Sequence, residues 1–299
     1  MPMETPPPKP GSLVSLLQSS TRELWIYGCM AAAGAAGGAV VGEVAIRILA
    51  WVMPDLNHES TLRNYLFTGT LAALCGAGIA LGFLLAGTVS RRAKLPGLGS
   101  FGFAFCAGAA AGCFSGLIAQ AFFALRPQDD WVTNYLLRPS AWALMGAILG
   151  LLLAYTVPNL GQVRGTIGGA VGGTLGAIGF VIVGIFMPNL MARMCGFAIL
   201  GLALGLCMVA IDVLSREASL EVIWGPNESA MLSLGPKAIS IGGGADTVYV
   251  AGLSPNLASV HFVNGRIEYI ESATNRTTVL RNGSRLKLGK VEVVVHSQS

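Results

Sequence analysis

The chain has 299 residues, of which 53% are hydrophobic and only 11% are charged, and it contains 40 glycines. This composition fits a membrane protein better than a soluble one. The net charge of +4 comes without a basic tract or a stripe of basic and aromatic residues, so it gives no reason to expect a nucleic acid as partner. The lipid bilayer is the expected surrounding of most of the chain.

The charged residues are unevenly distributed along the chain. Residues 215–299 hold 15 of the 34 charged residues, whereas the preceding apolar part is nearly bare. We therefore expect a transmembrane domain at 22–214 and a water-exposed domain at 215–299. Residues 1–21 are rich in proline and polar residues and lack the positive start and apolar centre of a cleavable signal. They are predicted to form a disordered tail.

Six apolar runs are long enough to cross a hydrocarbon layer of roughly 30 Å as helices of about 20 residues each. The runs are approximately Leu24–Met53, Tyr65–Val89, Leu98–Leu125, Ala141–Val157, Gly165–Met187 and Met191–Leu214. The fourth run is the shortest. The fold class expected for this part is an all-α membrane domain with six transmembrane helices.

Glycines recur at every fourth residue in the first, third and fifth runs. These ladders are Gly34, Gly38 and Gly42; Gly108, Gly112 and Gly116; and Gly168, Gly172 and Gly176. On a helix this spacing places all three glycines on one face, where another backbone can approach closely. The second, fourth and sixth runs each carry one glycine pair. The pattern predicts three glycine-rich hairpin repeats, and a glycine face left unused would allow a homo-oligomer.

The short loops give the expected orientation. Arg91, Arg92 and Lys94 lie between the second and third runs and Arg164 lies between the fourth and fifth. The loops after the odd runs mix acidic residues with arginines: Asp55, Glu59, Arg63, Arg126, Asp129 and Asp130. The positive-inside rule then places both termini in the cytoplasm. We expect a multi-pass protein of a cell membrane, such as the bacterial inner membrane.

Glu43 and Arg47 are the deepest charged residues of the predicted spans. They are four residues apart and so share one helix face, where they are expected to form a salt bridge. The alternative is an ion or proton pathway joined by Gln120 and Thr174. All six cysteines lie in apolar runs, which predicts core positions and no metal site. No cofactor is expected.

After Leu214 the apolar pattern changes from helical to alternating, which is typical of short strands. Asn264-Gly265 and Asn282-Gly283 each lie between such strands, and Asn-Gly is a strong hairpin signal. The sequence therefore predicts a small all-β sandwich.

The β part resembles a known family. Leu220–Glu228, Ile239–Gly242, His261 with its strand, and Leu280–Gly289 are similar to segments of a forkhead-associated (FHA) domain. The resemblance covers roughly 219–297 and does not extend to the membrane part. It implies an FHA-like β-sandwich that binds phosphothreonine peptides of a cytoplasmic protein through its loops.

The positions that bind phosphate in this family carry different residues in this chain. The residue after Gly242 is Gly243 where the family has an arginine, and Ala258 stands where it has a serine, with Ser259 one position away. The Asn-Gly-Thr motif of the family is similar to Asn275-Arg276-Thr277 of this chain, where arginine replaces glycine. Because arginine forks and hydroxyl donors make a phosphate site strong, we expect docking without phosphate. The predicted docking residues are Gly242, Gly243, Ala258, Ser259, His261, Asn275, Arg276 and Thr277.

The sequence is compatible with three functions to different degrees. The favoured hypothesis is a membrane protein whose cytoplasmic FHA-like module docks a protein or phosphoprotein in a signalling or scaffold role. The alternative is a channel or transporter that the module regulates. The repeats and Glu43 favour this alternative. An enzyme is not expected, since the three histidines are scattered and no phosphate loop or nucleophile elbow is present.

Overall fold

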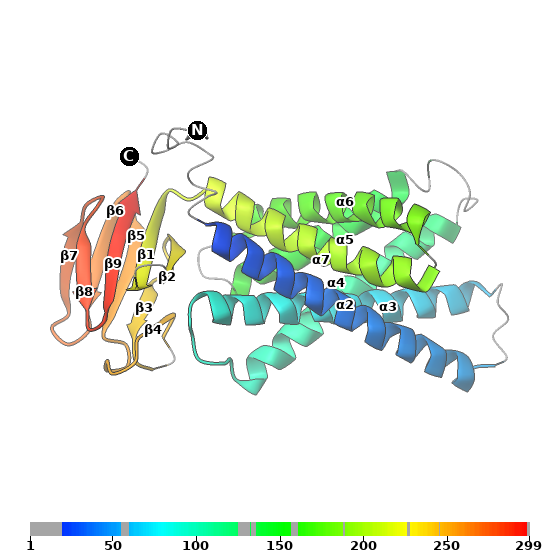
Figure 1. Ribbon diagram of the computed structural model, residues 1–299, viewed down its shortest axis with the longest axis horizontal. Helices are drawn as coiled ribbons and strands as arrows, with labels where there is room; N and C mark the ends of the chain where they lie inside the picture. Colours follow the sequence, from blue (N-terminus) through cyan, green and yellow to red (C-terminus); the bar gives the residue numbers. More distant parts are fainter. Residues whose placement is uncertain are drawn as a thin grey trace, which may run out of the picture.

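The computed structural model describes residues 20–54, 60–124, 132, 136–156, 161–187, 189–225, 228–244 and 246–297. A block of long helices is followed by a β domain, and the two lie end to end (Figure 1). The chain enters the first helix and leaves the last at the end of the block that faces the β domain, which we call the near end. The tail and the acidic loop residues Asp55, Glu59, Asp129 and Asp130 lie outside the described residues.

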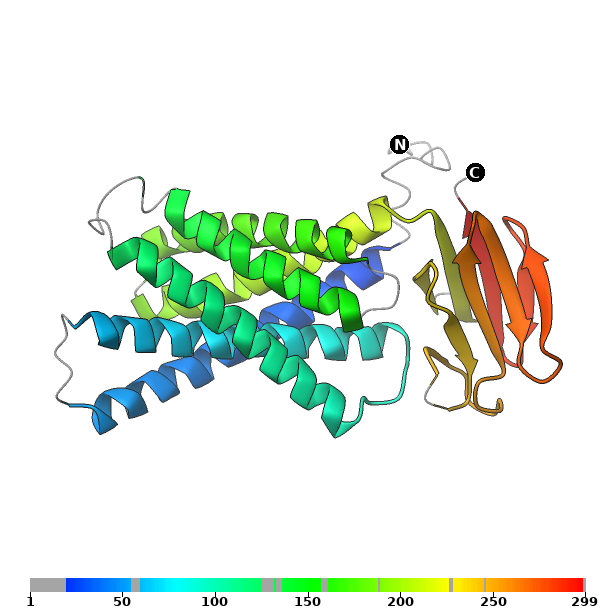
Figure 2. The same ribbon diagram turned by 180° about the vertical axis from the view of Figure 1, so that it is seen from behind.

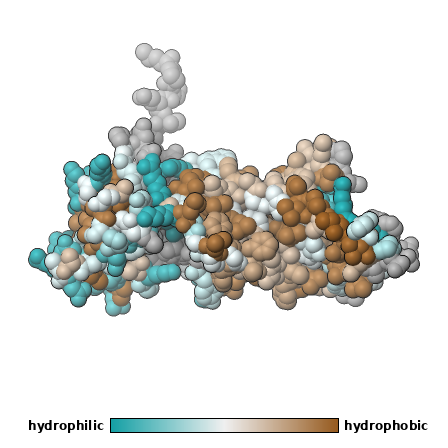
Figure 3. Space-filling view, turned by 90° about the horizontal axis from the view of Figure 1, so that it is seen from below, coloured by the Kyte–Doolittle hydropathy of each residue, from teal (hydrophilic) through white to brown (hydrophobic). Residues whose placement is uncertain are grey.

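The described helical block contains six long helices. They are α2 (Thr21–Val52), α3 (Thr61–Ser90), α4 (Leu98–Ala124), α5 (Arg138–Thr156), α6 (Gln162–Phe186) and α7 (Asn189–Leu214). All except α5 are long and apolar enough to cross a membrane, whereas the apolar segment of α5 covers only Pro139–Leu152. Large apolar side chains such as Trp51 and Leu98 are exposed on the outside of the block, and Figure 3 shows this apolar surface beside the hydrophilic β domain. This is the architecture of a multi-pass membrane protein.

The helices contact each other in a closed ring in chain order, with α7 returning to α2. Glycines lie at most of these contacts. A Cβ at Gly34 of α2 would collide with the carbonyl of Gly78 of α3, and a Cβ at Gly76 of α3 would collide with the carbonyl of Gly108 of α4. Gly146 of α5 meets α6 in the same way. Because α3 and α6 each offer glycine edges to two neighbours, the block consists of two triplets, α2–α3–α4 and α5–α6–α7.

Two of the three expected hairpins, α2–α3 and α6–α7, are present with their glycine ladders at the contact, whereas the middle one is wrong. Gly108, Gly112 and Gly116 contact α3, the preceding helix, and not α5, the following one. Helix α4 leans away from the other helices at its Leu98 end (Figure 2), where a Cβ at Gly99 or Gly102 would have open space. The reason is that a glycine ladder defines a narrow face but does not determine which neighbour uses it.

The β domain has two sheets around one core. Its strands are β1 (Ala218–Gly225), β2 (Glu228–Leu234), β3 (Ile239–Gly242), β4 (Val248–Tyr249), β5 (Ala258–Val263), β6 (Arg266–Glu271), β7 (Arg276–Leu280), β8 (Arg285–Leu288) and β9 (Val291–Ser297). The strand orders are β2-β1-β9-β8 and β4-β3-β5-β6-β7. Leu220 and Val293 of the first sheet and Ile241 and Val260 of the second are fully buried in the same cluster. Their alternation with partly exposed neighbours is what the sequence pattern predicts.

Gly172→Leu is expected to destabilise the helical block. A Cβ at this position would lie 2.7 Å from the Leu204 Cα and 2.9 Å from the Ala203 carbonyl oxygen of α7. Forcing these backbones apart typically costs about 1–3 kcal/mol of the free energy of unfolding. The matched control is Gly37→Leu, because a Cβ at Gly37 of α2 has no atom within 4 Å. Thermal melting of the purified protein in detergent should show a lower midpoint for Gly172→Leu alone; equal midpoints contradict the prediction.

Candidate functional site

Three loops of the five-stranded sheet meet at one end of the β domain. The pairing of Ile241 with Ala258, of Ala258 with Glu271 and of Glu271 with Arg276 brings the end of β3, the start of β5, the end of β6 and the start of β7 together. The loops after β3, before β5 and between β6 and β7 therefore lie side by side. We call them the apical loops.

Asp246 connects two of the apical loops from the inside. Its carboxylate accepts the backbone N–H of Gly244 at 3.0 Å and that of Asn256 at 3.1 and 3.2 Å, and the residue is buried. Hydrogen bonds from backbone N–H groups to a carboxylate are strong because the acceptor is charged. The N–H groups of Gly244 and Asn256 are thus occupied by the protein's own carboxylate.

The structure separates the predicted docking residues. Gly242 and Gly243 lie at the apical end, and a Cβ at Gly243 would collide with the Leu253 carbonyl oxygen, so only glycine fits this backbone. Ala258 is fully buried in the β domain. The next residue, Ser259, has the opposite parity on β5 and points to the other face of the sheet.

His261 and the turn before β7 account for the remaining predicted residues. The His261 Nε2 lies 3.2 Å from the Glu268 carboxylate on the neighbouring strand, so this histidine takes part in a cross-strand pair. Asn275 adopts the left-handed backbone conformation with φ 51° and allows the tight turn. Arg276 and Thr277 are exposed. Of the predicted set, Asn275, Arg276 and Thr277 are the exposed residues.

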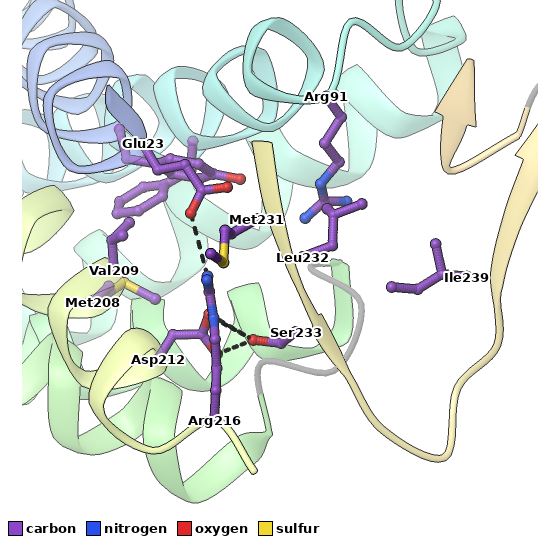
Figure 4. A pocket seen from close by; sticks show the side chains of 12 residues that line it. Glu23, Arg91, Met208, Val209, Asp212, Arg216, Met231, Leu232, Ser233 and Ile239 are labelled. Atoms are coloured by element: carbon purple, nitrogen blue, oxygen red, sulfur yellow. Dashed lines mark hydrogen bonds and ion pairs between the residues drawn. The ribbon is translucent and has the colours of Figure 1, made fainter. Parts of the chain in front are cut away.

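A buried ionic network joins the β domain to the helices (Figure 4). Arg216, in the segment between α7 and β1, donates from Nη2 to Asp212 at 2.8 Å and to Glu23 at 3.3 Å. Its Nε donates to the Ser233 Oγ of β2 at 2.7 Å, and the Ser233 hydroxyl in turn lies 2.9 Å from the Asp212 carboxylate. Four segments, namely α2, α7, the linker and β2, are thus held by one guanidinium.

Burial and the two carboxylates shift the pKa of Arg216 in opposite directions. Only 9% of its side chain is exposed, and this burial lowers the pKa of the guanidinium. The charges of Asp212 and Glu23 and their hydrogen bonds raise the pKa, and together they outweigh burial, so it lies above its usual value. A cavity of about 50 Å³ adjoins the network, and Arg91 lines it from the end of α3 (Figure 4). Sequence reasoning missed this network, although Arg216 follows Asp212 at a spacing of four residues.

The loop between α3 and α4 makes a second connection, this time to the apical side. The Lys94 Nζ donates to the Gly243 carbonyl oxygen at 3.4 Å and lies 5.0 Å from the centre of the Tyr249 ring. The Arg92 guanidinium lies over the Trp224 ring at 5.7 Å. Each exposed contact of this kind is weak. The Lys94 contact places the near end of the helices against one apical loop, and the Arg92 contact places it against β1.

The expected salt bridge between Glu43 and Arg47 is wrong. Glu43 of α2 pairs instead with Arg193 of α7, whose Nη1 lies 2.8 Å from the Glu43 Oε1, and Arg47 is exposed on the outside. Helix α7 packs along α2 through Gly201 and Gly205, so an arginine from another helix reaches Glu43. Gln120 bonds to Thr68 of α3, and Thr174 bonds to a carbonyl of its own helix; neither bond is to Glu43.

Comparisons with protein families, curated proteins and solved structures find no match for this chain. Among the described residues, no group of three or more His, Cys, Asp or Glu side chains is arranged to hold a metal ion.

Arg216→Met is expected to destabilise the junction strongly. The variant leaves the buried Glu23 and Asp212 carboxylates together without their cation, and breaking a buried pair in this way costs about 3–5 kcal/mol. The control is Arg285→Met, because the Arg285–Glu292 pair lies on the surface and such pairs contribute about 0–1 kcal/mol. Limited proteolysis of the linker at residues 215–217 should be faster in Arg216→Met. Equal cleavage rates in the two variants argue against a stabilising role.

Proposed function

We propose that this chain is an integral membrane protein that presents an FHA-like β domain at the cytoplasmic face and docks a protein partner through its apical loops without phosphate. The observation that supports this proposal best is the position of the Asp246 carboxylate. Its carboxylate occupies the N–H groups of Gly244 and Asn256 in two apical loops and adds a negative charge to these loops. A dianion approaching this carboxylate is repelled, whereas an uncharged or basic peptide is not.

The neighbouring positions support the same proposal. The backbone at Gly243 excludes an arginine side chain in its present conformation, and the buried Ala258 has no hydroxyl to offer. Arg276 and Thr277 are exposed at the start of β7, beside the turn after β6. Loops held by a rigid scaffold are where binding residues concentrate.

The attachment to the helices suits a scaffold role. The Arg216 network and the contacts of Arg92 and Lys94 hold the β domain at two separate places. A domain held in this way presents its loops in one orientation to the membrane surface, which lowers the entropic cost of binding for a partner that is itself at the membrane.

The proposed orientation predicts a labelling pattern. A membrane-impermeant maleimide added to intact cells is expected to react with Asp130→Cys and to spare Lys94→Cys, because Lys94 lies beside the β domain, on the side proposed to be cytoplasmic. Lys94→Cys should react only after the membrane is permeabilised. The opposite pattern places the β domain outside the cell and refutes the orientation.

The proposed docking mode predicts that phosphorylation of the ligand does not matter. The full-length protein in lipid nanodiscs is expected to bind a phosphothreonine peptide library no better than the unphosphorylated library in a titration by fluorescence anisotropy. The missing charge-assisted bonds, each contributing about 1.5–3 kcal/mol, explain the expected loss of about a hundredfold or more relative to a complete phosphate site. Micromolar binding that requires phosphate and disappears in Arg276→Ala contradicts the prediction.

A crosslinking experiment tests whether the partner binds on the apical side. A photoreactive amino acid at Arg276 should capture a protein in the native membrane, whereas the same residue at Arg266 should not. Both arginines are exposed and lie at opposite ends of β6 and β7, since Arg266 follows the β5–β6 turn. Capture from Arg266 alone moves the interface to the other end of the sheet.

A further inference from the structure

The five-stranded sheet ends in an open edge at the end of the molecule farthest from the helices. Strand β7 is the last strand of the order β4-β3-β5-β6-β7, and within the described chain it pairs with β6 alone. It lies at the extremity of the β domain, away from the helical block (Figure 1). Of its five residues, only Leu280 is buried. An open edge of this kind offers backbone N–H and C=O groups to an incoming strand.

The turn before β6 determines which backbone groups of β7 face this edge. The turn has two residues, both at positive φ, so the residues that flank it form a hydrogen-bonded pair between β5 and β6. Bonding alternates along a strand, and every second residue of β6 from Ile267 onward therefore bonds to β7. The residues opposite them on β7 are Leu280, Thr278 and Arg276. The N–H and C=O groups of Thr277 and Val279 are thus directed to the open edge.

The sequence of β7 does little to protect this edge. Exposed edges are usually protected by charged side chains, proline or a bulge. The residues of β7 after Arg276 are uncharged, mostly β-branched and free of proline, and the pairing with β6 runs without a shift in register. Strand β8, at the end of the other sheet, carries Arg285 and Lys287 instead. Strand β7 is therefore the edge better suited to accept another strand.

The surroundings of β7 are strongly basic. Residues 272–291 contain five cations and no acidic residue. Only Arg285 is paired, with Glu292, whereas the other four cations form no ion pair with the described residues. Even with the flanking Glu271 and Glu292 counted, this segment carries an excess of three positive charges. The five cations are all exposed, and they are Arg276, Arg281, Arg285, Lys287 and Lys290.

We propose that the open edge of β7 binds an extended acidic peptide segment as an additional strand. The backbone of the segment bonds to the outward groups of Thr277 and Val279, which supplies the affinity of strand addition. Carboxylates at the two ends of the segment pair with Arg276 and Arg281, which lie at the two ends of β7. This surface goes beyond the proposed docking through the apical loops, with which it shares Arg276.

The same observations disfavour three other occupants. Nucleic acid bases stack on aromatic side chains, and neither β7 nor β8 contains one. The membrane in which the helices lie is out of reach, because the edge is at the opposite end of the molecule (Figure 2). A second copy of this chain would bring two edges of the same charge together, and like charges on neighbouring strands are destabilising.

The test uses the full-length protein in nanodiscs of a zwitterionic phospholipid. The probe is a fluorescent nonapeptide with two glutamates at each end and alternating valine and threonine between them, and binding is followed by anisotropy. A version methylated on its central backbone nitrogens keeps the charges but cannot add as a strand, so it should bind about tenfold more weakly or worse. A version with lysine in place of glutamate should not bind. Equal binding of the methylated peptide overturns the proposal.

Two variants locate the binding edge. Val279→Pro removes an outward N–H and keeps the bonds to β6, since proline is tolerated where the N–H faces away from the sheet. Arg281→Gln leaves the backbone unchanged and lies outside the apical loops, so its result does not depend on docking there. Each variant should weaken binding of the acidic peptide by about tenfold. The control Arg164→Gln makes the same charge change at the start of α6 and should have no effect. Unchanged binding in Val279→Pro or in Arg281→Gln overturns the assignment to β7.

The other occupants are outcomes of the same experiment. A single-stranded oligonucleotide of nine bases should bind more weakly than the acidic peptide, and tighter binding shows that the basic segment serves nucleic acid. Val279→Cys should stay monomeric under mild oxidation. A disulfide between two copies that forms in the absence of peptide, and that excess acidic peptide does not prevent, shows that a second copy covers the edge. Either of these results overturns the proposal.

Discussion

The close approach of helix backbones at glycine is the constraint on which the rest of the molecule depends. Apolar side chains gain nothing by leaving lipid for a helix interface, so the helices must be held by packing. Helix α3 illustrates this, because Gly78 on one edge meets α2 and Gly76 on another edge meets α4. Helix α6 does the same for α5 and α7. Two triplets with a central helix each follow from these four contacts.

The same contacts position the polar groups. Gly201 and Gly205 of α7 lie against the first turns of α2, with Gly205 opposite Gly28, and this register brings Asp212 at the end of α7 next to Glu23 at the start of α2. Two buried carboxylates at one place require a cation, and Arg216 supplies it from the linker. The orientation of the β domain is therefore connected, through one guanidinium, to the packing of two glycines in the membrane part.

Much of the fold could be predicted from the sequence because it is local. The helices begin and end close to the apolar runs, and the Asn264-Gly265 turn joins β5 and β6 with both residues at positive φ. Which helices pack against each other was harder to predict, because a ladder such as Gly108 to Gly116 does not determine the neighbouring helix that it contacts. The pairing of Glu43 with Arg193 depends on the register of α2 and α7: Gly201 faces Ala31, so Arg193, eight residues earlier, comes opposite Ala39, one turn from Glu43. The sequence does not show this register.

The polar residues that sequence reasoning missed share one property, namely that their role depends on segments distant in the chain. Asp246 looks like an ordinary loop residue after three glycines, yet its carboxylate accepts the N–H of Asn256 from the next loop. Asp212 looks like a solvated helix end, yet it bonds to Ser233 of a strand. In both places a buried carboxylate accepts hydrogen bonds that connect separate segments of the chain. These buried carboxylates thus hold the fold, and in the proposed function the contact with a protein partner is left to the exposed rim of the apical loops.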